Sequence, residues 1–281
     1  LLKLSAEAEA AGITAIVGIG ATPGITNMLA AKVHRMLTRT TELHAAWNIE
    51  EKASAEDESL EYSAAIIHWM QQCSGTILEH RDGRLTSVKP LQEVILNYPG
   101  RGSRPVWTVG HPEPVSFSWS YPEIKQSACY MVMPALAADY FKKLSRKIDD
   151  GKLSIEEAGH QLVDSSKNVS WFDKILESVF HIFDRPRLPL FFVIGKGDID
   201  GRKATIAASI KAFPPGMARA TGIPLAIGLH QFAQGRVKVK GVTTPELALD
   251  ADAFFLELAP YCTYPGPLPA EDILDMVQEL E

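Results

Sequence analysis

One short loop carries the residue types best suited to acid–base chemistry. His111 and Glu113 each precede a proline in the segment GHPEP at residues 110–114. The prolines restrict the backbone of the loop, and a histidine titrates near neutral pH. A loop stiffened in this way can present both side chains to a pocket, with His111 as the general acid–base. The alternative is an exposed histidine on a rigid loop that takes no part in chemistry.

A glycine-rich turn, GIGATPG at residues 18–24, is the second candidate site. It follows a run of β-branched residues and opens a predicted helix, which is the setting of a dinucleotide-binding loop. Its spacing is G-x-G-x-x-x-G, however, and Pro23 stands where the third glycine of that motif belongs. We interpret it as a later strand-to-helix turn of a doubly wound sheet, which can still line a cofactor crevice. Two alternatives stay open: a primary phosphate loop with Glu50 as the ribose-binding acid, and a turn whose glycines serve its shape alone.

The end of a predicted helix, WMQQCSG at residues 69–75, places Cys73 next to Ser74. Cys73 has a simpler interpretation as a small buried core residue. The three cysteines are far apart in the sequence, and the remaining histidines show no metal-ligand spacing. The sequence therefore predicts neither a disulfide framework nor a metal site.

The elements that must position these groups alternate between helix and strand over residues 1–50. Residues 1–11 predict a helix that ends at Gly12, and the run ITAIVGI at residues 13–19 predicts a strand buried on both faces. Thr22 suits the N-cap and Pro23 the first position of the next helix, which extends to residue 37. Residues 42–50 predict a second strand, so this stretch has the alternation typical of a doubly wound fold.

The middle of the chain has a mostly antiparallel α+β pattern. Residues 62–73 predict a helix, and residues 76–134 predict strands and turns, with a hairpin at Asp82-Gly83. Helices follow, one opened by a capping box at residues 154–157 and another with an aromatic stripe at residues 171–183. Two antiparallel strands, at residues 188–194 and 204–210, are expected to join through Asp200-Gly201.

The last part of the chain is expected to fold back against residues 1–40. Residues 216–234 predict a helix that is interrupted near Pro224, because proline removes a backbone donor. A short strand at residues 237–242 and two helices, at residues 252–258 and 271–281, complete the prediction.

The composition excludes several classes of protein. Of the 281 residues 46% are apolar, which is enough to bury a large core. Lys and Arg number 28 against 34 Asp and Glu, and the resulting charge of −6 disfavours nucleic-acid binding. No stretch reaches about 18 apolar residues, so no membrane span is predicted. The cysteine pattern and the lack of a signal peptide predict a cytoplasmic protein. Because Leu1 already lies in a predicted helix, we expect the chain to be a fragment.

Four stretches together resemble the saccharopine dehydrogenase-like family. AGITAIVGIGATPGITNMLA at residues 11–30 resembles the strand, turn and helix that close the dinucleotide domain of that family. WMQQCSGTILEHRDG at residues 69–83, followed by GHPEPV at residues 110–115, resembles the middle domain. Residues 221–255, which contain GVTTPE, resemble the C-terminal segment. The resemblance extends over nearly the whole chain, and PGITN and GVTTPE are its most specific parts.

The resemblance implies an NAD(P)-dependent oxidoreductase that forms or cleaves a secondary amine between an amino acid and an aldehyde. It also implies an N-terminal Rossmann half, whose phosphate-binding loop for NAD or NADP is expected upstream of Leu1. We therefore expect imine reduction or secondary-amine oxidation on a small amino acid derivative, carried out by a homodimer. The candidate site residues are His111 and Glu113 for catalysis, Gly20, Thr22, Pro23 and Gly24 at the nicotinamide end of the cofactor, and Asn27, Cys73 and Ser74 on the substrate side.

The expected fold class is α/β plus α+β. Residues 1–40 are expected to close a doubly wound Rossmann-type domain, and residues 41–212 to form a mixed or antiparallel α+β domain for substrate binding and dimerisation. Residues 213–281 are expected to pack back on the Rossmann portion. One position departs from the family, because saccharopine-forming members commonly have Asp where this chain has Thr22. That departure favours the alternative function, a non-catalytic dehydrogenase-like scaffold used for dimerisation or cofactor sensing.

Overall fold

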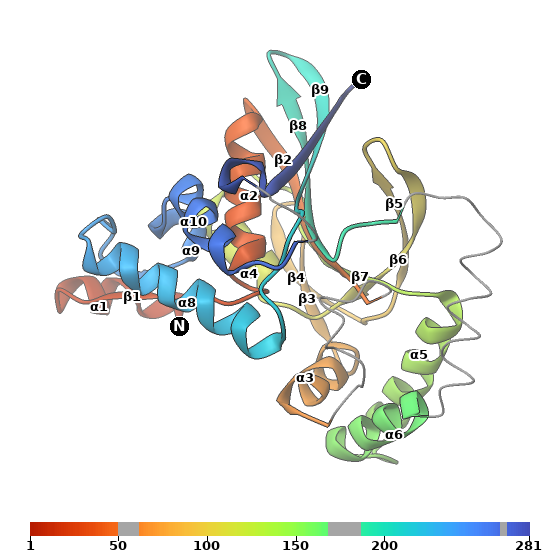
Figure 1. Cartoon of the computed structure of the whole chain (residues 1–281). Coiled ribbons are helices and arrows are strands. Elements are labelled where there is room, and N and C mark those ends of the chain that lie inside the picture. The colour runs from red at the N-terminus through yellow and green to blue at the C-terminus, as the bar shows by residue number, and fades with distance from the viewer. Residues whose placement is uncertain (50–61, 168–186, 265–268) are drawn as a thin grey trace.

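A curled seven-stranded sheet forms the centre of the chain in the computed structural model, which describes residues 1–49, 62–167, 187–264 and 269–281. Its strands are β2 (Arg39–Asn48), β5 (Glu93–Tyr98), β6 (Gly102–Val109), β7 (Cys129–Val132), β8 (Phe191–Ile199), β9 (Arg202–Ile210) and β11 (Leu274–Leu280). They are ordered β11-β9-β8-β2-β7-β6-β5. Strands β2 and β7 are parallel, and every other pair of neighbours is antiparallel. The sheet curls far enough for Arg101, in the β5–β6 turn, to pair with Asp275 on β11 (Figure 1).

Helix α2 (Ile25–Met36) packs on one face of this sheet, over β8 and β9. Its side chains Met28 and Val33 have no exposed surface. The helix comes so close to β8 that a Cβ at Gly195 would lie 2.4 Å from Val33 Cγ1. Glycine therefore permits this contact, and the close packing fixes α2 relative to the sheet.

Strand β2 is buried on both faces, which explains why apolar residues follow one another in its second half. Leu43, Ala45 and Trp47 belong to the core that includes α2. Ala46 belongs to a second core on the other face of the sheet. Since successive side chains of a strand point to opposite faces, Trp47 lies on the same face of the sheet as α2.

A second sheet has two parallel strands, β1 (Thr14–Ile16) and β10 (Gly241–Thr243). The strand predicted at residues 13–19 is therefore present, but it is shorter and only half-buried, and Ile13 is 54% exposed. Its one strand neighbour among the described residues is β10, which explains why burial on both faces was the wrong prediction. Four helices complete this part of the molecule (Figure 1). They are α1 (Ser5–Ala10), α8 (Met217–Ala233), α9 (Pro245–Ala248) and α10 (Ala251–Leu258).

The remaining elements belong to the middle of the sequence, and two of its predicted hairpins are confirmed. Asp82 and Gly83 connect β3 to β4 with positive φ angles of 51° and 78°, and residues 200–201 connect β8 to β9. The capping box at residues 154–157 is also confirmed, with reciprocal hydrogen bonds of 2.7 and 3.0 Å. The elements are α3 (Ala64–Gln72), β3 (Ile77–Arg81), β4 (Arg84–Val88), α4 (Glu113–Ser120), α5 (Ala135–Asp149) and α6 (Ile155–Lys167).

The helix predicted at residues 271–281 was wrong, because Leu274–Leu280 form β11. The strand pairs with β9 along its whole length, from Leu274 opposite Ile210 to Leu280 opposite Ala204. Residues such as Leu, Glu and Gln favour helices in isolation. Pairing with β9 overrides that propensity, because β9 would otherwise present unpaired backbone groups at the edge of the sheet.

Two other helices differ from the prediction, one in its interior and one in its first residue. The helix expected to break near Pro224 extends unbroken as α8, with Pro224 buried inside it. Proline lacks one backbone donor, and here the buried packing of α8 tolerates that loss. Helix α2 begins at Ile25 with Gly24 as its N-cap, so Thr22 and Pro23 lie in the turn and not at the helix start. The helix predicted at residues 171–183 lies outside the described residues, as does Glu50.

The mixed α/β architecture is confirmed, whereas the doubly wound arrangement stays a prediction. The division at residues 40 and 212 also stays a prediction. Segments from all three predicted parts meet at the large sheet, because α2 packs on β8 and β9 and β11 extends the sheet beyond β9. Within the described residues, no helix is long and apolar enough to cross a membrane.

Candidate functional site

The candidate site forms where β6 ends and α4 begins. The N–H of Gly110 donates to the carbonyl of Gln72 over 2.8 Å, which ties the loop to the end of α3. A Cβ at Gly110 would lie 2.6 Å from Ile77 Cγ2, so glycine lets the loop pass close to β3. Pro112 is the N-cap of α4 and Glu113 is its first residue. A carboxylate at this end of a helix is favoured by the helix dipole.

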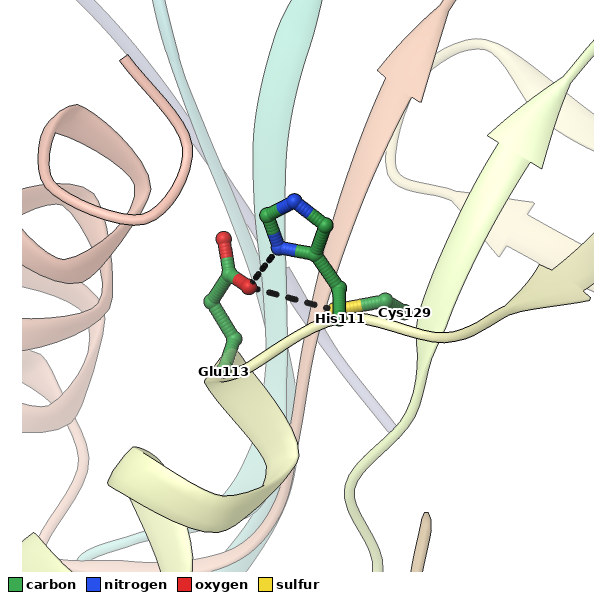
Figure 2. A group of neighbouring side chains, drawn as sticks. All are labelled: His111, Glu113 and Cys129. Carbon is green, nitrogen blue, oxygen red and sulfur yellow. Dashed lines mark hydrogen bonds and ion pairs between the residues drawn. The ribbon is translucent and has the colours of Figure 1, made fainter. Parts of the chain in front are cut away.

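The Glu113 carboxylate is completely buried and accepts hydrogen bonds from four side chains. Thr22 and Thr26 donate their hydroxyls to Oε1 over 2.6 and 2.8 Å. Oε2 accepts from Nδ1 of His111 and, over 3.7 Å, from the thiol of Cys129 (Figure 2). Burial alone would raise the pKa of Glu113, but the charge and hydrogen bond of His111 and the two threonine hydroxyls lower it to about 2. Glu113 is therefore an ionised acceptor at neutral pH.

His111 lies between this carboxylate and an indole ring. Its ring centroid is 4.9 Å from that of Trp47, with 59° between the ring planes, and 6% of its side chain is exposed. An ionised carboxylate only accepts hydrogen bonds, so Nδ1 must carry a proton. The other ring nitrogen, Nε2, points away from Glu113 in Figure 2 and has no hydrogen-bond partner within the described part of the chain. Nε2 is therefore the atom that can exchange a proton with a ligand.

The glycine-rich turn contributes Thr22 to this site, while its own backbone donors point inward. The N–H groups of Gly24, Ile25 and Thr26 donate to acceptors in the turn and in α2, over 2.8, 3.0 and 3.4 Å. A Cβ at Gly24 would lie 2.0 Å from the carbonyl oxygen of Gly20, so glycine is needed to close the turn. A phosphate at the start of a helix binds to free N–H groups. The geometry therefore fits a structural turn and does not fit a primary phosphate loop.

The carboxylate of Glu246, on α9, is also buried. Ser120 donates to its Oε1 and Asn27 Nδ2 to its Oε2, both over 2.8 Å. Asn27 Nδ2 also donates to Ser116 Oγ over 3.0 Å, and that hydroxyl donates to the backbone carbonyl of Glu113 over 3.2 Å. Burial raises the pKa of Glu246, although its hydrogen bonds act in the opposite direction. One hydrogen-bonded network thus joins the two buried glutamates.

The predicted substrate-side residues lie apart from the His111 ring. Asn27 is completely buried, and its amide binds Gly24, Ser116 and Glu246. The hydroxyl of Ser74 donates to the carbonyl of Met70 over 2.7 Å. Cys73 is 2% exposed, and burial raises the pKa of its thiol to about 12. Among the described contacts, none joins these three side chains to His111, and their role in substrate binding stays a prediction.

The side chains of His111, Glu113 and Cys129 are also a set of potential metal ligands, because their donor atoms lie within 4.8 Å of one another. A histidine nitrogen, a carboxylate and a thiolate are a ligand set that suits zinc. The thiol would have to ionise first, yet burial and the nearby carboxylate raise the pKa of Cys129 well above its ordinary value. Four donors already satisfy Glu113, so hydrogen bonds alone explain the cluster. The sequence-based expectation of no metal stays a prediction, which metal analysis of the purified protein tests.

Comparison with known proteins adds information on the fold. No protein-family model matches the sequence, and no curated protein matches it. Among solved structures, apo histidine-tagged saccharopine dehydrogenase (L-Glu forming) from Saccharomyces cerevisiae is similar, with a TM-score of 0.51 and 15% sequence identity. The alignment covers 95% of this chain and 75% of that one. The chain has a saccharopine dehydrogenase-like fold.

The sequence analysis missed several residues of the site in this saccharopine dehydrogenase-like fold, among them Thr26, Cys129 and Glu246. Glu246 follows two threonines and a proline in GVTTPE, and an acidic residue after such a helix start is a usable signal. Thr26 lies inside an amphipathic helix, and Cys129 lies in a short apolar strand. At those two positions no local pattern separates a site residue from a core residue, so only the tertiary structure reveals them.

Proposed function

We propose that this chain is part of an NAD(P)-dependent oxidoreductase that reduces an imine, or oxidises a secondary amine, on an amino acid derivative. The likeness of fold to saccharopine dehydrogenase supports the reaction class. One observation carries the proposal: the buried Glu113 carboxylate binds Nδ1 of His111 and, at the same time, the Thr22 hydroxyl of the glycine-rich turn. This contact joins an acid–base group to the turn predicted to line the nicotinamide end of the cofactor.

The role of the chain's own residues in this reaction concerns the proton. Glu113 keeps a proton on Nδ1 of His111 and stabilises the imidazolium, as the third group of a catalytic triad does. The ring packs against Trp47, which limits its rotation. Nε2 can then give a proton to an imine nitrogen or take one from an amine nitrogen.

The cofactor would carry the hydride chemistry, and the described turn does not supply its phosphate site. The N–H groups at the start of α2 are occupied by internal acceptors, so a dinucleotide has to be held by other groups. Gly20, Thr22, Pro23 and Gly24 are proposed only as neighbours of the nicotinamide end. The proposal for this chain is therefore confined to proton transfer and to the positioning of His111.

The test is a comparison of His111→Ala with His68→Ala, which removes an exposed histidine of α3 as a matched control. Oxidation of NADH and NADPH is followed by absorbance, with a panel of amino acids mixed with aldehydes or oxo acids. Loss of a general acid–base is expected to lower turnover by about 10²-fold or more, while the circular dichroism spectrum stays unchanged. Normal turnover of His111→Ala would exclude the acid–base role. No activity with any pair in the unaltered protein would favour the non-catalytic scaffold.

Two further expectations from the sequence belong to the same proposal. We propose a homodimer, which sedimentation equilibrium tests by giving twice the mass of one chain. We also propose a cytoplasmic location, which fractionation of cells tests directly.

A further inference from the structure

A cavity of about 390 Å³ opens at one end of the large sheet. It lies between the residues that precede β8 and those that follow β9, with Leu190 and Lys211 among its lining residues. The N–H of Asn48, at the end of β2, donates to the carbonyl of Leu190 over 2.8 Å. The cavity therefore lies beside the carboxyl end of β2, an edge of the sheet where ligands of α/β proteins commonly bind.

Three positively charged residues line this cavity from separate segments: Arg101 in the β5–β6 turn, Arg187 before β8 and Lys211 just after β9. The Arg101 guanidinium is held in place by Asp275, over 3.1 Å, by the backbone carbonyl of Arg187 and by the face of Tyr98, 5.3 Å from the ring centroid. It therefore loses little conformational freedom when it binds a ligand.

Lys211 differs from Arg101, because its side chain is exposed and has no ion-pair partner in the described ranges. Asp275 is the one acidic residue that lines the cavity within the described parts of the chain, and Arg101 already pairs with it. A positive site of this kind in a chain with a net charge of −6 attracts small anions.

The rest of the lining indicates what kind of anion fits. Leu188, Leu190 and Phe213 form an apolar wall, and the hydroxyl-bearing Ser209, itself 1% exposed, also lines the cavity. A compact inorganic ion would leave this apolar wall unused. A short aliphatic chain with a carboxylate at each end would contact the wall and pair with Arg101 and Lys211.

The cavity is separate from the His111 site, because a row of aromatic side chains lies between them. Trp47 contacts the ring of His111 and pairs in register with Phe191. Phe191 stacks on Phe213, with ring centroids 4.9 Å apart, and Phe213 lines the cavity. A ligand in the cavity therefore needs no contact with His111.

We propose that this cavity is a binding site for a small aliphatic dicarboxylate, held by Arg101 and Lys211. The site does not depend on the proposed oxidoreductase function. His111→Ala protein is expected to bind such an anion as the unaltered chain does, so failure of one proposal is distinguishable from failure of the other.

The experiment is calorimetry of the full chain with succinate at constant ionic strength. Succinate is expected to bind at one saturable site, and the uncharged succinamide is expected not to bind. Lys211→Met removes one charge-assisted contact and is expected to weaken succinate binding about tenfold. Lys203→Met, at an exposed lysine of β9 and outside the cavity, is the matched control and is expected to change nothing.

Arg101→Met is expected to abolish binding, but its contacts with Asp275 also support the fold, so Lys211→Met decides the question. Two results would overturn the proposal. They are the absence of saturable succinate binding, with or without binding of sulfate, and an equal effect of the two lysine variants.

Discussion

Two buried glutamates, Glu113 and Glu246, lie in one hydrogen-bonded network but in opposite electrostatic settings. Their exposed fractions are 0% and 7%, and both connect through Asn27 and Ser116. Glu113 faces a histidine, whereas the hydrogen-bond donors to the Glu246 side chain in the described structure are neutral. Burial acts on both, yet the pKa falls to about 2 for Glu113 and rises for Glu246.

The difference shows that the partner, and not the depth of burial, decides what a buried carboxylate does. His111 and the two threonine hydroxyls together outweigh desolvation and keep the Glu113 carboxylate ionised, which suits a group that must orient a histidine. The neutral hydrogen-bond donors around Glu246 do not outweigh desolvation, so its carboxyl group is a weaker acid than an exposed glutamate. Its hydrogen bonds to Asn27 and Ser120 connect α9 to α2 and α4. Carboxylates whose environments move their pKa values apart are a common mark of divided roles in active sites.

The largest effect is expected for Glu113→Gln. The substitution removes the negative charge that His111 faces and places an amide NH₂ among groups that donate. Removing one partner of a buried ion pair costs about 3–5 kcal/mol, and we expect a loss near the lower limit because His111 can still donate to the amide oxygen. Urea denaturation at neutral pH measures the change in the free energy of unfolding.

Glu246→Gln is the matched control for that experiment. Asn27 can donate to the new amide oxygen, and the amide NH₂ can donate to Ser120, whose hydroxyl then turns toward Thr244, 2.7 Å away. Asn27 and Ser120 keep hydrogen-bond partners in this variant, so the cost is expected to stay within about 1 kcal/mol. Equal losses in the two variants would show that the electrostatic contrast between the glutamates has no effect on stability.

Asn27→Ala is expected to have the next largest effect, because this amide is the link between the two glutamates. The substitution leaves the N–H of Gly24 and one oxygen of Glu246 without their partner. A buried unsatisfied group costs about 1–3 kcal/mol, and the free energy of unfolding should fall accordingly in thermal or urea denaturation. Asn97→Ala, at an exposed asparagine of β5, is the control and should change little. An equal loss of unfolding free energy in Asn27→Ala and Asn97→Ala would exclude the role of Asn27 as a link between the two glutamates.

The sequence predicted the elements around this site better than the contacts within it. The loop at residues 110–114 stood out because a proline follows each of His111 and Glu113, and a histidine near a glutamate indicates acid–base chemistry from the local sequence alone. The hydrogen-bonded network that joins the two glutamates could not be predicted from the sequence. Asn27, Ser116 and Glu246 are far apart in the sequence and meet only through tertiary packing. The failure at residues 271–281 has the same origin, since pairing with β9 decides the structure of β11.

The pH dependence of stability should have opposite signs for the two glutamates. Because the pKa of Glu113 is lowered from 4.5 to about 2, its stabilising contribution is complete above pH 4.5 and is lost as pH falls toward 2. The difference in the free energy of unfolding between the unaltered chain and Glu113→Gln should therefore shrink as pH falls over that interval. Because the pKa of Glu246 is raised, its contribution is complete below pH 4.5 and is lost as pH rises through the raised value.

Denaturation of the unaltered chain and both variants across this pH range tests the signs. Subtracting the free energy of unfolding of each variant from that of the unaltered chain cancels the contributions of the titratable groups that all three proteins share. Glu246→Gln should become relatively more stable as pH rises, whereas Glu113→Gln should become relatively less stable. The same sign for both differences would contradict the assignment of the cationic partner to Glu113 alone.

The smallest effect is expected for Ser120→Ala, which tests how Glu246 is kept in place. Ser120 donates to Oε1 of Glu246, and this hydrogen bond acts to lower the pKa of the glutamate. Its loss should cost about 1 kcal/mol at neutral pH, and it should raise the pKa of Glu246 further. The cost should therefore be smaller below pH 4.5, where Glu246 is protonated in the folded and unfolded states. Ser118→Ala is the control, because it removes a hydroxyl that donates to a carbonyl of the same helix. Its cost should not depend on pH in this way. The same pH profile for Ser118→Ala and Ser120→Ala would exclude a specific effect on Glu246.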